Sequence, residues 1–341
     1  MYPYVSDIFQ DLFGFEWPLP FPLNSFGLMV ALALLTATWL ARIELDRLYA
    51  RGLIAPVRAK VPDAKGRERE RDVSPSFYIW TLMGISAVAG IVGSKLFNII
   101  DFWEEFVQNP IGTIFSGSGL TFYGGLILAS ISVAWYAHRK GIHVPRLADS
   151  IAPGLLGAYG IGRIGCYLSG DGDWGLCSSL VDKPGWVPGW LYSETFPRAF
   201  VYGPRLVGDE VVDIQDPVTF NELVRGVECT VANATGVLPT MLYEFVLCAA
   251  LGGGLWLLRK HPFKAGWLFS LFLVIQGLER FLIEFIRTNR EWAFGLSQSQ
   301  WISIGLMTAG VIGLVMLTRR VRPGWGDPPE TATEAEPVAA A

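Results

Sequence analysis

The sequence predicts an all-α polytopic membrane protein with seven transmembrane helices, and three observations support this class. Of the 341 residues, 51% are hydrophobic and 17% are charged, whereas a soluble domain carries about a quarter charged residues. The apolar residues are gathered into long blocks, and a spanning helix needs about 20 mainly apolar residues. The segments that connect these blocks are alternately rich and poor in basic residues, as loops on the two sides of a membrane are.

Seven apolar blocks are long enough to span a bilayer. They cover residues 24–42, 77–99, 120–137, 147–168, 239–258, 266–288 and 297–318. The fourth block is rich in glycine, and the sixth contains charged residues. The first block has no basic segment before it and no small-residue cleavage site after it, so we expect a retained helix rather than a signal peptide.

The distribution of Lys and Arg predicts the orientation of these helices, because cytoplasmic loops are enriched in both residues. The loop 43–76 is strongly basic, as are the short segments after the third and fifth blocks and the flank of the seventh. Segments 1–23 and 100–119 contain no Lys or Arg. We therefore expect the N-terminus outside the membrane and the C-terminus in the cytoplasm.

The expected organisation has four parts. Residues 1–168 hold helices 1–4 and the cytoplasmic loop 43–76, and residues 239–320 hold helices 5–7. Between them, residues 169–238 contain turn signals and form a small extracytoplasmic insert. Residues 321–341 are rich in Pro, Ala, Thr and Glu, which predicts a disordered cytoplasmic tail. The charged run 58–72 in the first loop mixes both signs and is typical of a solvated loop.

Ionisable side chains inside spanning helices are costly and are therefore candidates for function. At a rise of about 1.5 Å per residue, they and Tyr123 fall in the outer halves of their helices. They are Lys95, Arg163, Glu244, Glu279, Arg280, Glu284 and Arg287. Their common depth predicts a polar pocket open to the outer leaflet or periplasm. For Arg287 and Lys95, the alternative is that the side chain snorkels to the headgroups without further purpose.

Two helices carry the candidate phosphate-binding residues. In the sixth block, Gln276, Arg280, Glu284 and Arg287 recur at i, i+4, i+8 and i+11, which places them on one helical face. In the fourth block, Arg163 lies among glycines that allow the close approach of a backbone or a ligand. A guanidinium binds phosphate through planar, bidentate hydrogen bonds. A phospholipid headgroup is the phosphate expected at this depth.

The residues that carry these features resemble a known family, the prolipoprotein diacylglyceryl transferases. Gly162-Arg163-Ile164-Gly165 and the Gly-rich turn Ser169–Gly175 resemble the family signature. Further similar blocks occur in the family's order. They are Phe122–Ile127, Pro239–Glu244, Gly277–Arg287 and Gly295–Gln300. The resemblance covers residues 24–318 and includes the seven helices.

The resemblance implies a reaction in which the thiol of a lipobox cysteine, in a lipoprotein precursor, attacks the glyceryl group of phosphatidylglycerol. It also implies a multi-pass protein of the bacterial inner membrane with the active site facing the outer leaflet, in contact with membrane lipids. We expect Arg163 and Arg280 to stabilise the charge on the departing phosphate. The expected substrate-binding residues are Arg163, Arg280, Gly124, Gly125, Gly165, Tyr243, Glu244, Gly175, Arg287 and Lys95. No metal, cofactor or nucleic acid is expected.

The proton acceptor for the substrate thiol is left open by the sequence. Many family members have a histidine where this chain has Tyr123, so a histidine base is not available on the outer side. Glu284, Asp171 and Tyr123 are candidates, and the field of the arginines is another way to favour the thiolate. Glu284 has an alternative, structural role as the partner of Arg280 at i+4.

The cysteines carry two further expectations. Cys177 and Cys229 both lie in the insert, where oxidation is permitted, so a disulfide between them is plausible. Cys166 is interpreted as a buried packing residue, and the four cysteines and three histidines lack the spacing of a metal site. A lipid or solute transporter, or a binding protein, that uses the same pocket is the alternative function. An internal repeat would favour it, and the sequence contains none.

Overall fold

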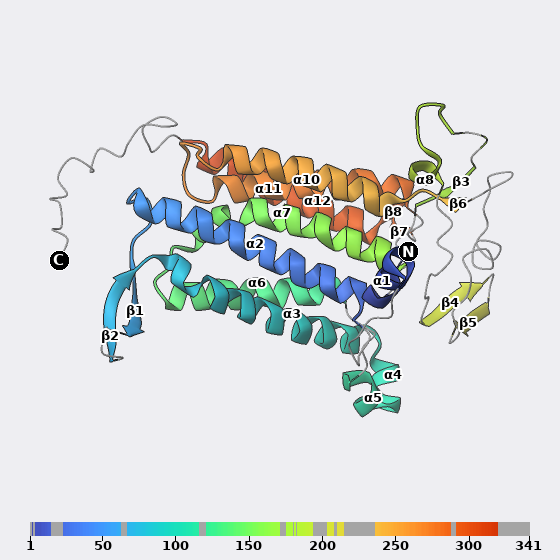
Figure 1. Cartoon of the computed structure of the whole chain (residues 1–341), viewed down its shortest axis with the longest axis horizontal. Coiled ribbons are helices and arrows are strands. Elements are labelled where there is room, and N and C mark those ends of the chain that lie inside the picture. The colour runs from blue at the N-terminus through green and yellow to red at the C-terminus, as the bar shows by residue number, and fades with distance from the viewer. Residues whose placement is uncertain are drawn as a thin grey trace. The chain divides into compact units, whose positions relative to one another are not determined.

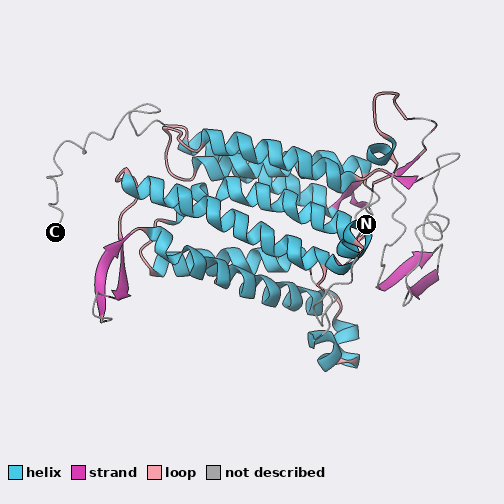
Figure 2. Ribbon diagram, in the orientation of Figure 1, coloured by secondary structure: helices cyan, strands magenta, loops and turns pink. Residues whose placement is uncertain are grey.

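The computed structural model describes residues 2, 4–14, 23–62, 67–115, 121–170, 175–179, 181, 183–193, 203–207, 210–214, 236–287 and 291–319. Figures 1 and 2 show that this part of the chain is mainly helical, with short two-stranded sheets. The long helices are α2 (Ser25–Ala50), α3 (Ile79–Asp101), α6 (Phe122–Arg139), α7 (Val144–Ser169), α10 (Thr240–Leu258), α11 (Trp267–Ile283) and α12 (Gln298–Leu317). Each of the seven apolar blocks therefore contains one long helix.

Among the described residues, four helical segments are long and apolar enough to cross a membrane. They are Ser25–Ala50, Pro75–Asp101, Thr240–Leu258 and Gln298–Leu317. The second of these begins with the short 3₁₀ helix η1 (Pro75–Tyr78), which leads directly into α3. Their length and composition make the chain a helical, multi-pass membrane protein, which confirms the predicted class in this coarser form. Crossing by all seven helices, and their orientation, stay predictions.

The shorter elements lie mainly between the predicted blocks, except that η2 falls within the sixth block and β8 reaches the first residue of the seventh. They are the helices α1 (Val5–Phe13), α4 (Trp103–Gln108), α5 (Pro110–Phe115) and α8 (Gly189–Tyr192), the 3₁₀ helix η2 (Glu284–Ile286), and the strands β1 (Val57–Pro62), β2 (Glu68–Val73), β3 (Cys177–Ser178), β4 (Gly203–Val207), β5 (Glu210–Ile214), β6 (Gly236–Val237), β7 (Glu291–Ala293) and β8 (Leu296–Ser297). The strands pair antiparallel as β1–β2, β3–β6, β4–β5 and β7–β8.

The chain divides into two compact units. The first contains Met1–Ala37 and Ala152–Arg319, and the second contains Thr38–Ile151 and Arg320–Ala341. The first unit holds most of α7 together with α10, α11 and α12. The second holds α3 and α6, the C-terminal part of α2 and the β1–β2 hairpin.

Small residues bring helices of the first unit into close contact. On α12, a Cβ built at Gly310 would lie 2.7 Å from the Ser270 carbonyl oxygen of α11. On α11, a Cβ at Gly277 would lie 2.9 Å from the Ser303 carbonyl oxygen of α12. Lipid tails are as apolar as leucine, so helices in a membrane associate through such close backbone packing. The two glycines hold α11, which carries Arg280, firmly against α12.

The helices α7 and α10 also pack through glycine. A Cβ at Gly160 would lie 3.3 Å from the Phe245 carbonyl oxygen, and one at Gly252 would lie 3.3 Å from the Gly157 backbone nitrogen. The buried side chains Leu156, Cys248, Leu255 and Leu268 form the apolar core at this contact. The close packing brings residue 163 of α7 near residue 244 of α10.

The second unit has its own core and an unexpected hairpin. Buried apolar side chains from α2, α3, α6 and α7 gather with Ile54 and Val57 in one cluster. The expected loop 43–76 is wrong in detail, because α2 continues to Ala50 and the charged run forms the β1–β2 hairpin. Opposite charges face each other across it, with Arg58 opposite Asp72 and Lys60 opposite Glu70. Cross-strand neighbours of opposite charge favour a sheet, and in β1 the exposed basic residues alternate with the buried Val57 and Ala59.

Several sequence expectations concern residues outside the described part of the chain. These are the disordered tail 321–341, the proton-acceptor candidate Asp171, and the Cys177–Cys229 disulfide, because Cys229 is not described. Cys166 and Cys248 are buried, and this agrees with the packing role expected for Cys166.

Candidate active site

A fully buried carboxylate, Glu244 of α10, is the centre of a cluster of charged residues in the first unit. Its Oε2 lies 3.0 Å from Arg163 Nε and 3.6 Å from Arg287 Nη1. Its Oε1 lies 3.2 Å from Arg280 Nη1 and accepts a hydrogen bond of 2.9 Å from the Tyr159 hydroxyl. One carboxylate therefore holds three guanidinium groups from α7, from α11 and from the segment after α11.

A second carboxylate, Glu284, lies at the C-terminal end of α11. Its Oε2 is 3.0 Å from Arg280 Nη2 and 3.8 Å from Arg287 Nε. Its Oε1 accepts a hydrogen bond of 2.6 Å from the Ser297 hydroxyl. Ser297 is also the N-cap of α12, where its hydroxyl accepts a hydrogen bond from the Gln300 amide at 3.2 Å. The start of α12 is thus linked through one serine to the charged cluster.

Arg163 is oriented by a residue on its own helix. Tyr159 precedes it by one turn, and the Tyr159 hydroxyl accepts hydrogen bonds of 3.1 and 2.8 Å from Arg163 Nε and Nη2. The guanidinium carbon also lies 5.0 Å from the centre of the Tyr159 ring. A Cβ built at the neighbouring Gly162 would meet no described atom within 4 Å. The helix surface at Gly162 therefore has no described side chain packed against it.

The position of Arg287 corrects the sequence prediction. The sixth block, 266–288, was expected to be one helix with Arg287 on the same face as Arg280. The helix α11 ends at Ile283, residues 284–286 form a 3₁₀ turn, and Arg287 is extended with φ −108° and ψ 157°. The reason is local pairing with the insert: Arg287 forms a β-bridge with Gly175, and the Leu176 amide donates to the Ile286 carbonyl at 2.9 Å.

The three arginines differ in how far solvent or a ligand can reach them. The side chain of Arg163 is 11% exposed and that of Arg280 is 17% exposed, whereas that of Arg287 is 3% exposed. Snorkelling therefore does not describe Arg287, which lies between two carboxylates. Arg163 and Arg280 are the two cations of the cluster that an incoming anion can contact, and Glu244 joins them.

Glu279, one residue before Arg280, has different surroundings. It is buried, and its Oε2 accepts a hydrogen bond of 3.0 Å from the Gln276 amide. Its Oε1 has no hydrogen-bond partner among the described residues. This carboxyl forms no ion pair there, unlike Glu244 and Glu284, so the described cluster has three cations and two paired carboxylates.

The structure explains two predicted substrate-binding glycines through packing. A Cβ at Gly165 would lie 3.0 Å from Met29 Cβ of α2. A Cβ at Gly175 would lie 2.7 Å from Leu238 Cβ, at the point where Gly175 bridges to Arg287. Tyr243, also predicted, donates a hydrogen bond to the Leu191 carbonyl of α8. These residues support the cluster, and a contact with substrate stays a prediction.

The remaining predicted residues lie in the second unit. Gly124 and Gly125 of α6 pack against α3, where a Cβ at Gly125 would lie 2.8 Å from the Gly90 carbonyl oxygen. Lys95 donates a hydrogen bond of 3.1 Å to the Thr113 carbonyl of α5. Tyr123 is half-buried on α6. These residues belong to the second unit and the cluster belongs to the first, and their roles stay predictions.

Sequence reasoning missed Tyr159, Ser297 and Ser299. Tyr159 has a detectable signal, because a residue four positions before an intramembrane arginine lies on the same helical face. Ser297 precedes Gln300 by three residues, the spacing of a capping box. Ser299, whose hydroxyl accepts a hydrogen bond of 3.3 Å from Arg280 Nη2, has no comparable signal.

The long apolar helices define the class of this chain, a helical multi-pass membrane protein, and its comparison with known proteins gives the family. A model of the family described as prolipoprotein diacylglyceryl transferase matches residues 14–316. The chain belongs to the prolipoprotein diacylglyceryl transferase family. The resemblance seen in the sequence is therefore confirmed.

Three relatives illustrate the similarity, and each is named phosphatidylglycerol–prolipoprotein diacylglyceryl transferase. That of Dehalococcoides mccartyi is 30% identical over 231 residues, covering 67% of this chain and 72% of the relative. That of Leptospira interrogans is 24% identical over 311 residues, covering 84% and 78%. That of Bacillus cereus is 26% identical over 298 residues, covering 87% and 88%.

Proposed function

We propose that this protein transfers the diacylglyceryl group of phosphatidylglycerol to the thiol of the lipobox cysteine in lipoprotein precursors, the first step of lipoprotein maturation. The observation that carries the proposal is the pair Arg163 and Arg280, held 3.0 and 3.2 Å from the two oxygens of Glu244. Family membership supplies the reaction class. The arrangement supplies a site for the phosphate.

The reaction requires one bond to form and one to break. The substrate sulfur attacks the glyceryl carbon that bears the phosphate, and the C–O bond breaks as the thioether forms. The electron pair of that bond leaves with glycerol phosphate, and the thiol proton is lost. The protein provides no nucleophile, so its main task is to stabilise the charge that grows on the leaving phosphate. Preorganised donors in a site that excludes water do this well.

Arg163 and Arg280 perform this task in the proposal. A guanidinium presents five N–H donors in a rigid plane, which allows it to bind a protein carboxylate and a phosphate at once. Glu244 fixes both planes in advance and offsets the repulsion between the two cations. Arg287 is buried against Glu244 and Glu284, so its role is to hold these two carboxylates in position beside Arg163 and Arg280.

We assign Glu284 a structural role rather than that of proton acceptor. Glu284 contacts two guanidinium groups and receives the Ser297 hydroxyl, and these contacts favour its structural role. Tyr123 and Asp171 stay as candidates, together with a thiolate favoured by the field of Arg163 and Arg280.

We further propose that the protein resides in the bacterial inner membrane with seven crossings, and that the cluster faces the outer leaflet. The support is the distribution of Lys and Arg described above. This orientation gives the cluster access to phosphatidylglycerol and to precursors presented from the periplasm.

The proposal is tested with purified protein reconstituted with phosphatidylglycerol and a lipobox peptide, by following the mass gain on the peptide cysteine. The parent is expected to form the diacylglyceryl adduct. Arg163→Ala and Arg280→Ala each remove one charge-stabilising donor, which typically costs a factor of about 10²–10³ in rate.

The matched control is Arg139→Ala, since Arg139 stacks on Trp135 at the end of α6 and lies outside the cluster. Its rate is expected to equal that of the parent. If folded parent protein binds the lipid but yields no adduct, the transferase proposal is wrong and a binding or transport function takes its place.

A further inference from the structure

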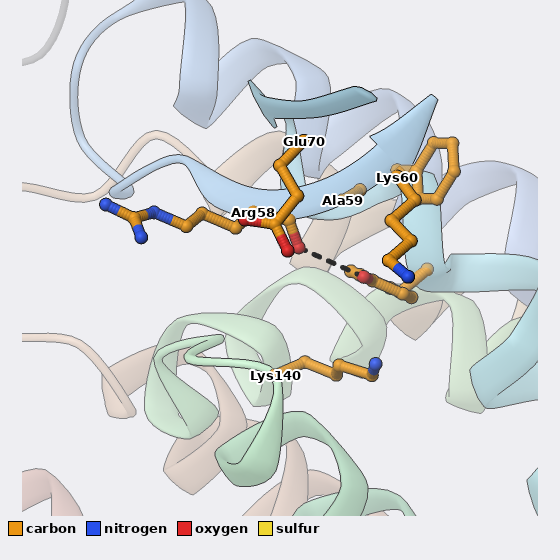
Figure 3. A pocket seen from close by; sticks show the side chains of 7 residues that line it. Arg58, Ala59, Lys60, Glu70 and Lys140 are labelled. Carbon is orange, nitrogen blue, oxygen red and sulfur yellow. Dashed lines mark hydrogen bonds between the residues drawn. The ribbon is translucent and has the colours of Figure 1, made fainter. Parts of the chain in front are cut away.

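The second unit contains a pocket that the proposed reaction does not use. It has a volume of about 360 Å³ and is lined by Arg58, Ala59, Lys60, Glu70, Phe77, Tyr78 and Lys140. Ligand pockets in proteins typically have volumes of about 300–1,000 Å³. Figure 3 shows that Lys60, from strand β1, and Lys140, from the end of α6, reach the pocket from different elements.

The sequence of β1 explains why cations line this pocket. Val57 and Ala59 alternate with Arg58 and Lys60, so the apolar residues are buried and the basic residues are exposed. The Tyr78 hydroxyl donates a hydrogen bond of 3.1 Å to the Arg58 carbonyl, which fastens the hairpin to η1. The β1–β2 hairpin is therefore attached to η1, at the N-terminal end of α3.

The charge of the lining is unbalanced. Arg58, Lys60 and Lys140 are three cations, and Glu70 is the one carboxylate among the lining residues. None of the three cations forms an ion pair with a carboxylate in the described ranges. The Lys140 ammonium instead lies 5.0 Å from the centre of the Tyr78 ring and 5.6 Å from that of Tyr136. The pocket presents positive charge that an anion can neutralise.

The pocket also lies at the start of a candidate membrane span. Phe77 and Tyr78 belong to the first turn of the candidate span Pro75–Asp101. Aromatic side chains are enriched where spanning helices meet the headgroup region, and basic pockets at this level bind anionic headgroups. This placement follows from the end of the span and is independent of the orientation of the protein.

We propose that this pocket binds a phosphate group, presented by an anionic phospholipid headgroup or by a small phosphate-bearing solute. Lys60 and Lys140 contact the phosphate, and Arg58 adds to the positive field. Lysine binds phosphate as a point charge. The aromatic rings of Phe77 and Tyr78 form the apolar side of the pocket. The site is separate from the Glu244 cluster and plays no part in the transfer chemistry.

The experiment measures lipid and phosphate binding to the full-length protein in detergent micelles. Phosphatidylglycerol and phosphatidylcholine are compared as lipid probes by native mass spectrometry, and inorganic phosphate is titrated calorimetrically. Every measurement is repeated with Arg163→Ala, so that lipid held at the candidate active site is not counted. The test variant is Lys60→Gln with Lys140→Gln. The control, Arg71→Gln with Arg139→Gln, removes the same charge from the β1–β2 hairpin and from the end of α6, at residues that do not line the pocket.

Phosphatidylglycerol is expected to bind the parent more tightly than phosphatidylcholine. Each charge-assisted contact contributes about 1.5–3 kcal/mol, so the test variant is expected to bind at least about tenfold more weakly. The control is expected to match the parent, and Lys60→Arg with Lys140→Arg is expected to retain binding. If inorganic phosphate shows this pattern and the lipid does not, the ligand is a small solute.

Equal binding by the parent and the test variant, for both probes, would overturn the proposal. Thermal unfolding of each variant shows whether the fold is intact, and the single variants Lys60→Gln and Lys140→Gln replace the double variant if it unfolds. Transfer activity of the pocket variants is expected to equal that of the parent. Loss of the adduct with Arg163→Ala and retained binding at the pocket would separate this proposal from that of the enzyme.

Discussion

Glu244→Gln is the substitution with the largest predicted effect on stability. The amide has nearly the shape of the carboxylate, so the change removes one charge and little packing. It leaves Arg163, Arg280 and Arg287 within 3.0–3.6 Å of a neutral group in a site with no exposure at residue 244. Removing one partner of a buried ion pair costs about 3–5 kcal/mol, because the other charge stays buried without compensation.

Two neighbouring glutamates provide matched comparisons. Glu284→Gln removes a carboxylate that contacts two guanidinium groups, so its cost is expected to be smaller than that of Glu244→Gln. Glu279→Gln alters a carboxyl whose hydrogen bond among the described residues comes from the Gln276 side-chain amide, and we expect a change within about 1 kcal/mol, the net value of an ordinary hydrogen bond. The predicted order of destabilisation is therefore 244, then 284, then 279.

The assay is equilibrium unfolding by denaturant in mixed micelles, followed by tryptophan fluorescence. The free energy of unfolding of a native protein is about 5–15 kcal/mol, so the loss predicted for Glu244→Gln is a large fraction of the total. A Glu279→Gln variant as unstable as Glu244→Gln would refute the reasoning, since burial alone, rather than the number of paired cations, would then set the cost.

Four further substitutions, one of them a control, test helix packing, a helix cap and a turn in the first unit. Gly310→Ala places a methyl group 2.7 Å from the Ser270 carbonyl oxygen and is expected to destabilise the α11–α12 contact by about 1–3 kcal/mol. The control Gly305→Ala, on the same helix, meets nothing within 4 Å and is expected to stabilise the protein by about 0.5–1 kcal/mol. Thermal unfolding compares the two variants, and equal effects would contradict the packing argument. Ser297→Ala removes the α12 cap and the hydrogen bond to Glu284. The substitution is expected to lower the free energy of unfolding by about 1–2 kcal/mol and to slow diacylglyceryl transfer. An unchanged unfolding midpoint would count against this prediction. Phe294 has φ 54° at an exposed turn before Gly295, and asparagine suits a turn of this kind. Phe294→Asn is therefore expected to stabilise the detergent-solubilised protein by about 1 kcal/mol. A lower midpoint of thermal unfolding would disprove this.

The sequence predicted the residues of the cluster better than their geometry. Intramembrane charge is costly enough to identify Arg163, Glu244 and Arg280 without a structure. Periodicity then failed at Arg287, because an apolar pattern continues past Ile283 although the helix does not. The end of the helix is set by backbone pairing with residues 175 and 176, which lie more than 100 positions away in the sequence and leave no local signal.

The hairpin β1–β2 and the capping serine illustrate a second limit. Strands are usually recognised by alternating apolar residues, and residues 68–72 of β2 are charged and exposed. Ser297 is recognisable as a helix cap, but its bond to Glu284 depends on how α11 and α12 pack. Local chemistry was therefore visible in the sequence, while the partners supplied by tertiary contacts were not.

The paired base of the insert has a consequence for how this chain tolerates variation. Strands β3 and β6 join residues 177–178 to 236–237, and the Leu176 and Leu238 backbones are bonded beside them. A segment whose ends are already held together can lengthen at little cost, because the entropy of closing a loop grows only slowly with its length. The residues between 179 and 235 thus connect two chain segments that are already paired with each other. We expect a change in the length of this stretch to leave the pairing of Gly175 with Arg287 in register, as long as α8, whose Leu191 carbonyl accepts the Tyr243 hydrogen bond, is kept.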